Sequence, residues 1–245
     1  MIKRQSGNVM FIILATIGLI AALTMMLSNS ERSSATMGNE KSALQLQQIM
    51  NYAANIERGV QRVLVQNNCQ IGEMNFDHPD LENYDTNAFY KNPSSPSDKS
   101  CDIFDVKGGG VTYQAPPEMS QNVGSNEYGI LSAVRIHNIG TNTSASGEEL
   151  ILHTRLDRAT CILANNQFGI DNPSGEPPAT TGSFTYNIPY NDWKTFPRAS
   201  TAEGFGSGDN LGDNISEEAL AGHKAGCFYA PSESTYNLFY VLLTR

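Results

Sequence analysis

The stretch of sequence that decides the fold is residues 33–67, SSATMGNEKSALQLQQIMNYAANIERGVQRVLVQN. It has no proline, and the residues that dominate it, Ala, Leu, Gln, Met, Glu and Arg, favour helices. Gly38 and Gly59 are weak points that each cost up to about 1 kcal/mol. The apolar residues recur at steps of three and four, which predicts an amphipathic helix that packs against a globular domain or neighbouring subunits. They are Leu46, Ile49, Met50, Ala53, Ile56, Val60, Val63 and Leu64.

An apolar run precedes this stretch, and no charged residue lies between Gly7 and Ser30. Its core, Val9–Leu27, would span about 28 Å as a helix, close to the hydrocarbon thickness of a bilayer. Lys3 and Arg4 lie before the run, which predicts a cytoplasmic N-terminus and an exported remainder. A cleaved secretory signal is the alternative, but its apolar region is ordinarily only about 7–15 residues long. We therefore expect a retained single-pass helix over residues 8–30.

The basic leader (residues 1–7), the charge-free helix and the amphipathic continuation (residues 31–67) together resemble type IV pilin-like and type II secretion pseudopilin-like proteins. The matching residues are KRQSG followed by NVMFIILATIGLIAAL. The resemblance implies cleavage by a prepilin peptidase after Gly7, which would leave Asn8 as the first residue. It also implies a helix that packs with other pilin-like subunits in a filament core and a mostly β head that faces outward.

The sequence departs from the family pattern at two positions, which affects the kind of subunit that it resembles. The family usually carries Glu at the fifth position after the cleavage site, whereas this sequence has Ile12, and its usual first residue is Phe or Met rather than Asn8. A buried carboxylate is costly unless it meets a partner charge, so Ile12 removes a docking contact between subunits. The chain is therefore more similar to minor or tip-type subunits, and to pilin-like membrane proteins of proteobacteria.

Composition excludes several classes of protein. The chain has 245 residues, of which 16 are basic and 25 acidic, for a net charge of −9. Nucleic-acid binders normally present a basic face, so nucleic acid is not an expected partner. The hydrophobic content of 40% is too high for wholesale disorder. No GxSxG or HExxH motif occurs and the four histidines are scattered, so we expect no enzyme activity.

The predicted head, residues 68–245, holds all the cysteines. Four cysteines allow three pairings, and we favour the sequential one, Cys69–Cys101 and Cys161–Cys227. Each bridge would add roughly 2–4 kcal/mol by restricting the unfolded chain. Structural zinc is the rival interpretation, but no CxxC motif is present.

The head is predicted to be mostly antiparallel β with one short helix, which makes the fold class α+β. Asp157 is a suitable N-cap for a helix over residues 158–168 that ends near Gly169. Strands are expected at 129–140 and 150–156, as two strands around a Gly turn in 101–113, and as a hairpin within 227–244.

Acidic residues and glycines alternate near the end of the chain. Asp209, Asp213 and Glu217 could bind Ca²⁺, since flexible oxygen-rich loops can wrap this ion. Some pseudopilins fix such loops with calcium, which supports this interpretation through the resemblance. The spacing matches no EF-hand, and the pattern favours a solvated acidic loop. No other cofactor is expected.

Aromatic residues cluster in residues 184–196, with Asn and Asp between them. Tyr190, Trp193 and Phe196 could stack on sugars or contact a partner protein. The size of the single Trp favours the other interpretation, that these side chains pack in the core of the head.

The sequence thus predicts a pilin-like structural subunit, anchored in the inner membrane and incorporated into, or capping, a type IV pilus or type II secretion pseudopilus. Its head would lie in the periplasm or outside the cell. The alternative is an envelope-anchored glycan- or protein-binding module that does not polymerise.

Overall fold

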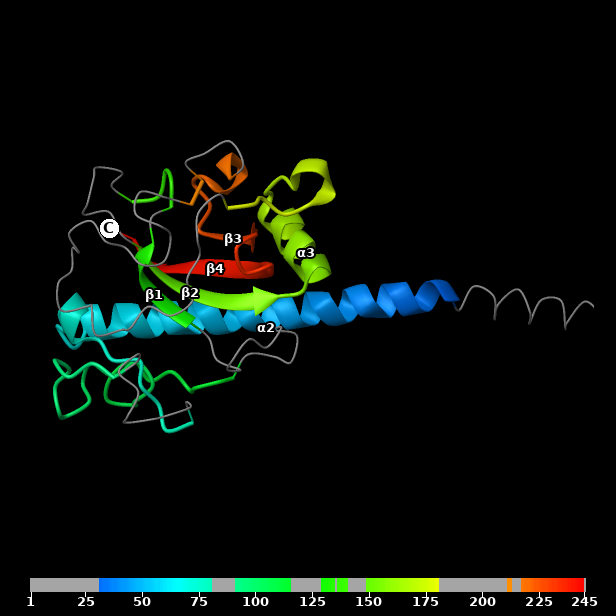
Figure 1. The fold of residues 1–245 in the computed structure, drawn as a ribbon. Coiled ribbons are helices and arrows are strands. Elements are labelled where there is room, and N and C mark those ends of the chain that lie inside the picture. The colour runs from blue at the N-terminus through cyan, green and yellow to red at the C-terminus, as the bar shows by residue number, and fades with distance from the viewer. Residues whose placement is uncertain are drawn as a thin grey trace, which may run out of the picture. The chain divides into compact units, whose positions relative to one another are not determined.

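The computed structural model describes residues 31–80, 91–115, 129–134, 136–140, 149–180, 211–212 and 217–244 (Figure 1). The expected leader, residues 1–7, and the expected membrane helix, residues 8–30, lie outside these ranges. Contacts divide the chain into two units, Met1–Leu44 and Gln45–Arg245. Within the described ranges, no helix combines the length and the apolar character needed to cross a bilayer.

Helix α2, Glu31–Val65, confirms the amphipathic helix predicted from the periodicity. In the second unit, the apolar stripe of α2 is buried as expected, and Tyr52 joins it. Met50 and Leu64 are half-buried at its edges. The stripe therefore faces the core of the head, and its fully buried members are Leu46, Ile49, Ala53, Ile56, Val60 and Val63.

A four-stranded antiparallel sheet lies beside the helix (Figure 1). Its strands are β1 (Gly129–Val134), β2 (Glu149–Leu156), β3 (Ala225–Ala230) and β4 (Thr235–Leu243), in the spatial order β1-β2-β4-β3. The helices and the antiparallel sheet confirm the α+β class. The predicted strand over 129–140 is too long, because Ile136 forms only an isolated bridge and Asn138 turns the chain with φ 61°.

Side chains on the two faces of the sheet enter separate cores, as the alternation along a strand requires. Leu150 and Leu152 of β2 face the buried stripe of α2, whereas Ile151 between them packs with Phe228 and Phe239 on the opposite face. All eight residues of β2 are consequently buried.

Helix α3, Arg158–Phe168, forms where it was predicted. The Asp157 side chain accepts a hydrogen bond from the backbone N–H of Thr160, and Gly169 ends the helix in the left-handed conformation with φ 73°. The described ranges also contain three short 3₁₀ turns: η1 (Ile71–Glu73), η2 (Pro173–Gly175) and η4 (Glu218–Leu220).

Both disulfides have the predicted sequential pairing. Cys161–Cys227 joins α3 to β3 with a Cα–Cα distance of 5.4 Å. Cys69–Cys101 joins the chain just after α2 to a later loop with a Cα–Cα distance of 5.9 Å. No free cysteine remains, since all four are paired.

The prediction of two strands within 101–113 is wrong. The segment is a series of turns in which the Asp105 carbonyl accepts hydrogen bonds from the backbone N–H groups of both Gly108 and Gly110, at 3.0 and 2.8 Å. These bonds coil the glycines into a compact turn. The two sides of the segment are joined by isolated backbone hydrogen bonds, such as Val111 N–H to Ile103 O at 3.1 Å, and not by a strand ladder. We call residues 102–111 the glycine turn.

Candidate functional site

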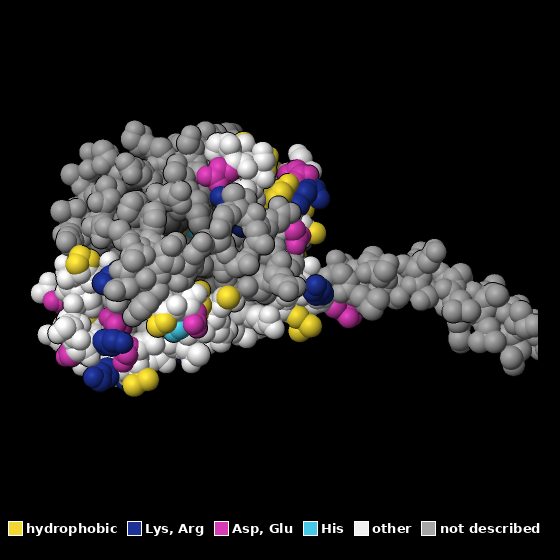
Figure 2. Space-filling view, turned by 60° about the horizontal axis from the view of Figure 1, so that its bottom comes forward, with side chains coloured by type: hydrophobic (Ala, Val, Ile, Leu, Met, Phe, Trp, Pro, Cys, Tyr) yellow, Lys and Arg dark blue, Asp and Glu magenta, His cyan; other side chains and the backbone are white. Residues whose placement is uncertain are grey.

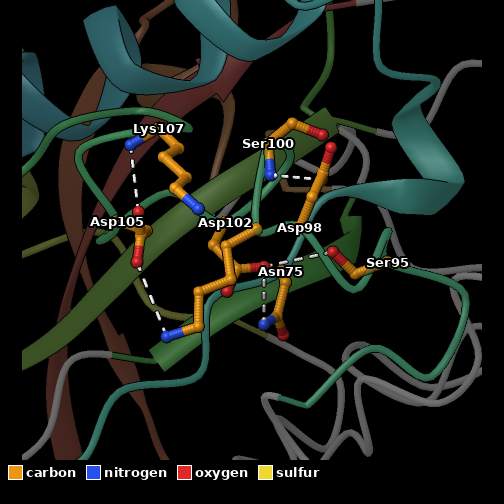
Figure 3. Close-up of polar contacts among 8 residues, drawn as sticks. Asn75, Ser95, Asp98, Ser100, Asp102, Asp105 and Lys107 are labelled. Carbon is orange, nitrogen blue, oxygen red and sulfur yellow. Dashed lines mark hydrogen bonds and ion pairs between the residues drawn. The ribbon is translucent and has the colours of Figure 1, made fainter.

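A polar network around Asn75 and Asp102 joins the glycine turn to the loop before it (Figure 3). Asn75 Nδ2 donates to Asp102 Oδ1 over 3.0 Å, and Ser95 Oγ donates to the same oxygen over 3.1 Å. The Asn75 Oδ1 atom accepts from the backbone N–H of Asn92 at 2.9 Å. The network thus ties three residues of the loop closed by Cys69–Cys101, namely Asn75, Asn92 and Ser95, to each other and to Asp102.

Two further carboxylates of this region have partners of their own (Figure 3). Asp98 accepts from the Ser100 backbone N–H at 2.9 Å, and hydrogen bonds from Ser100 hold the pKa of Asp98 below its usual value. Asp105 accepts from the Lys107 backbone N–H at 2.9 Å and lies 3.5 Å from Lys99 Nζ, and the backbone bond lowers the pKa of Asp105. Both carboxylates are therefore ionised at pH 7, and each already accepts a backbone hydrogen bond, Asp98 before the glycine turn and Asp105 within it.

One side of the glycine turn borders a small pocket of about 230 Å³, whose lining includes His78, Phe104, three carboxylates (Asp77, Asp102 and Asp105) and the Lys99 that pairs with Asp105. Two of its lining residues belong to an aromatic cluster: the His78 ring stacks on Tyr113 at a centroid distance of 4.6 Å, and Phe104 meets both rings edge-on. Among the described residues, no group of three or more acidic, His or Cys side chains has an arrangement that could hold a metal ion.

The other side of the turn borders a larger cleft of about 510 Å³, which we call the arginine cleft. Helix α2 supplies Arg58 and Arg62 to its lining, and the chain after the turn supplies Thr112 and Gln114. Arg62 Nη2 donates to the Val106 carbonyl over 3.1 Å, which anchors the guanidinium on the turn.

Two glycines allow α2 and the glycine turn to approach this closely. A Cβ atom on Gly59 would lie 2.5 Å from Val111 Cγ2, and one on Gly110 would lie 2.4 Å from Arg62 Nη1. Gly110 also has φ 67°, which disfavours other residues. From the sequence, we interpreted Gly59 only as a weak point of the helix. In the structure, its missing side chain makes room for the turn.

Most of the predicted site residues lie outside the described ranges: Gly7, Asn8, Tyr190, Trp193, Phe196, Asp209 and Asp213. Glu217 is described, and its expected place in a solvated loop is wrong, because only 1% of its surface is exposed. Its Oε2 accepts a hydrogen bond from the Gly212 backbone N–H over 3.1 Å. This carboxylate therefore supports a buried turn.

The most deeply buried histidine has a structural arrangement. Asn237 Nδ2 donates to Thr235, so Asn237 Oδ1 is the acceptor and His153 Nε2 carries the hydrogen of their 2.9 Å bond. Burial is the main cause that lowers the pKa of His153 to about 3. His153 is neutral at pH 7, and its ring links β2, to which it belongs, to Asn237 of the neighbouring strand β4.

Sequence reasoning did not find the arginine cleft. The spacing of Arg58 and Arg62 placed both on the polar face of the helix, but nothing local indicated that a turn some forty residues later covers that face. On the face in Figure 2, the described acidic and basic side chains are interspersed rather than gathered by sign. Comparisons with family models, with curated proteins and with solved structures found no match for this chain.

Proposed function

We propose that the chain is a pilin-like structural subunit, anchored in the inner membrane by residues 8–30 with its N-terminus in the cytoplasm. The observation that carries the proposal is the way α2 belongs to the head. Its apolar stripe from Leu46 to Val63 is buried against the sheet, while the same stretch of chain continues the charge-free run that ends at Ser30. A single helical stretch would thus connect the anchor with the head.

The two disulfides support an exported head. Disulfides persist in oxidising compartments such as the bacterial periplasm and are rare in the cytosol. Both bridges lie beyond the charge-free run in the sequence. The basic leader before that run favours the same orientation.

The subunit would be incorporated into, or cap, a type IV pilus or a type II secretion pseudopilus. Prepilin peptidase would cleave after Gly7, and other pilin-like subunits would pack on the helix that begins at Asn8. Ile12 replaces the carboxylate that most family members use for docking, which favours a minor or tip subunit.

Mass spectrometry of the mature N-terminus, on chain purified from membranes, tests this proposal. We expect a mature chain that begins at Asn8, and we expect the Gly7→Val variant to retain its leader. A Ser6→Ala variant is the matched control and should be processed normally. A chain that begins at Met1, or near Glu31 or Thr36, would contradict the proposal.

A second candidate function is an envelope-anchored module that binds glycans without polymerising. The stacked His78 and Tyr113 rings beside the carboxylates of Asp77 and Asp102 favour it, because sugars stack on aromatic faces and hydrogen-bond to acidic and amide groups. Glycan-array binding that is lost in the Tyr113→Ala variant, together with an unprocessed leader, would favour this function over the first.

A further inference from the structure

The arginine cleft concentrates positive charge in an acidic protein. The chain carries a net charge of −9, yet the described lining of the cleft includes Arg58 and Arg62 and no Asp or Glu. Ion pairs elsewhere in the described head, such as Arg155 with Glu233 and Arg158 with Glu176, place a carboxylate directly beside each arginine. Among the described residues, neither cleft arginine has such a partner.

Each cleft arginine also keeps donors to spare. Arg58 Nε donates to the Ala54 carbonyl of its own helix over 3.2 Å, and Arg62 Nη2 donates to Val106 O over 3.1 Å. A guanidinium has five N–H groups in a planar fork. The described residues accept no other hydrogen bond from either guanidinium, so most of these donors remain available for a ligand that enters the cleft.

The two guanidinium groups suit a ligand with more than one carboxylate. Arg58 and Arg62 are four residues apart on α2, which corresponds to about 6 Å along the helix axis. Carboxylates pair with such forks through two parallel hydrogen bonds. Arg62 is held by the glycine turn, since Gly110 lies against its guanidinium. A fixed fork loses less freedom when a ligand binds.

The neutral residues of the cleft indicate what else the ligand carries. Asn55, Gln66 and Gln114 line it with amide groups, and Thr112 adds a hydroxyl. Pockets for small molecules are predominantly apolar, whereas side-chain amides match the N–H and C=O groups of a peptide backbone.

We propose that the arginine cleft binds an acidic peptide segment of a partner protein, with its carboxylates paired to Arg58 and Arg62. A segment of this chemistry could come from a second copy of this chain, which has 25 acidic residues, or from a different protein. All the described lining residues of the cleft lie in the second unit, Gln45–Arg245, so binding does not depend on whether the leader is cleaved.

The experiment uses the full chain in non-ionic detergent and a fluorescein-labelled tetraglutamate peptide, with fluorescence anisotropy as the readout. We expect saturable binding at about 50 mM salt that weakens at about 300 mM, because salt screens exposed charges. Arg58→Gln and Arg62→Gln should each weaken binding roughly 5- to 10-fold, since each removes one charge-assisted pair. Arg58→Gln spares the glycine turn, because the hydrogen bond that Arg58 makes within the described part of the chain goes to Ala54 of its own helix.

Arg158→Gln is the matched control, because it makes the same substitution at an exposed arginine that already pairs with Glu176, and it should bind like the wild type. A tetraglutamine peptide should not bind. The proposal is overturned if tetraglutamate fails to bind, if both cleft variants bind like the wild type, or if inorganic phosphate binds and the peptide does not.

Sedimentation of the full chain without peptide distinguishes the source of the segment. Salt-sensitive self-association that both cleft variants abolish would assign the segment to a second copy. A chain that stays monomeric while it binds tetraglutamate would assign it to a different protein.

Discussion

The Tyr240 hydroxyl of β4 donates a hydrogen bond to Glu57 Oε2 of α2 over 2.6 Å. The other oxygen of the same carboxylate pairs with Lys224, just before β3. A single carboxylate thus ties the helix to the sheet at two points. Burial, reinforced by the bond to Glu57, raises the pKa of Tyr240 well above its usual value.

Replacing Tyr240 with Phe should lower the free energy of unfolding by about 1 kcal/mol, because Glu57 loses a hydrogen bond while its pair with Lys224 remains. Urea unfolding followed by circular dichroism measures the change. Tyr229→Phe is the matched control on the neighbouring strand, where the ring lies 4.9 Å from Tyr236, and it should change stability by less than about 0.5 kcal/mol. Equal losses in both variants would contradict the assignment.

Gly59→Ala should destabilise the head by about 1–3 kcal/mol, although Ala is the better helix former. The new Cβ would lie 2.5 Å from Val111 Cγ2 and 3.4 Å from Ile103 Cγ2. Thermal unfolding of the single variants and of the Gly59→Ala/Val111→Ala double variant gives a double-mutant cycle. The double variant should recover part of the loss, and strictly additive losses would show that the two side chains do not collide.

Stability should fall as the pH is lowered below about 6.5, because of His153. Its pKa is about 3 in the folded chain against 6.5 ordinarily, so between these values the unfolded chain binds a proton that the folded chain does not. Acid therefore favours unfolding, by roughly 3 kcal/mol at a pH of about 4.5.

Urea titrations at a pH of about 6.5 and of about 4.5 measure this difference in the free energy of unfolding. His153→Gln should flatten the dependence. His137→Gln, which changes an exposed side chain, should leave it intact. A wild-type stability that is independent of pH across this range would contradict the prediction.

Replacing Cys161 and Cys227 together with Ala should cost about 4 kcal/mol, since the bridge closes a loop with a sequence separation of 66. The measurement is urea unfolding of the oxidised full chain, compared with the double variant. Both sulfurs lie in the core between α3 and β3, so part of the loss reflects packing. A loss below about 1 kcal/mol would show that the unfolded chain is not restricted by the bridge.

Much of the fold follows from local patterns in the sequence. Asp157 and Gly169 mark the two ends of α3 by cap chemistry alone. The aromatic and aliphatic run of β4 and the turn before it predict the terminal hairpin. The apolar periodicity of α2 predicts which side of the helix faces the core. In each case the deciding contacts are a few residues apart along the chain.

The candidate site depends on contacts that no local pattern encodes. The residues KGGG at 107–110 suit a turn between two strands, but here they coil against α2, because Gly59 leaves room for Val111. Arg62 reaches Val106 across a separation of 44 residues. The acidic, glycine-rich sequence around Glu217 is typical of a surface loop. Its carboxylate is nevertheless buried and accepts a hydrogen bond from the Gly212 backbone N–H. Tertiary packing decides these positions.

The strand order β1-β2-β4-β3 also has a consequence for the timing of folding during synthesis. Strand β4 follows the other strands in the chain but lies between β2 and β3, and it forms the backbone ladder with each of them. A nascent chain that has emerged only as far as Ala230 can pair β1 with β2, but its β3 lacks β4, the strand that it pairs with in the sheet. The sheet must therefore close after β4 emerges, and until then the partly synthesised head presents unpaired strand edges to chaperones and proteases.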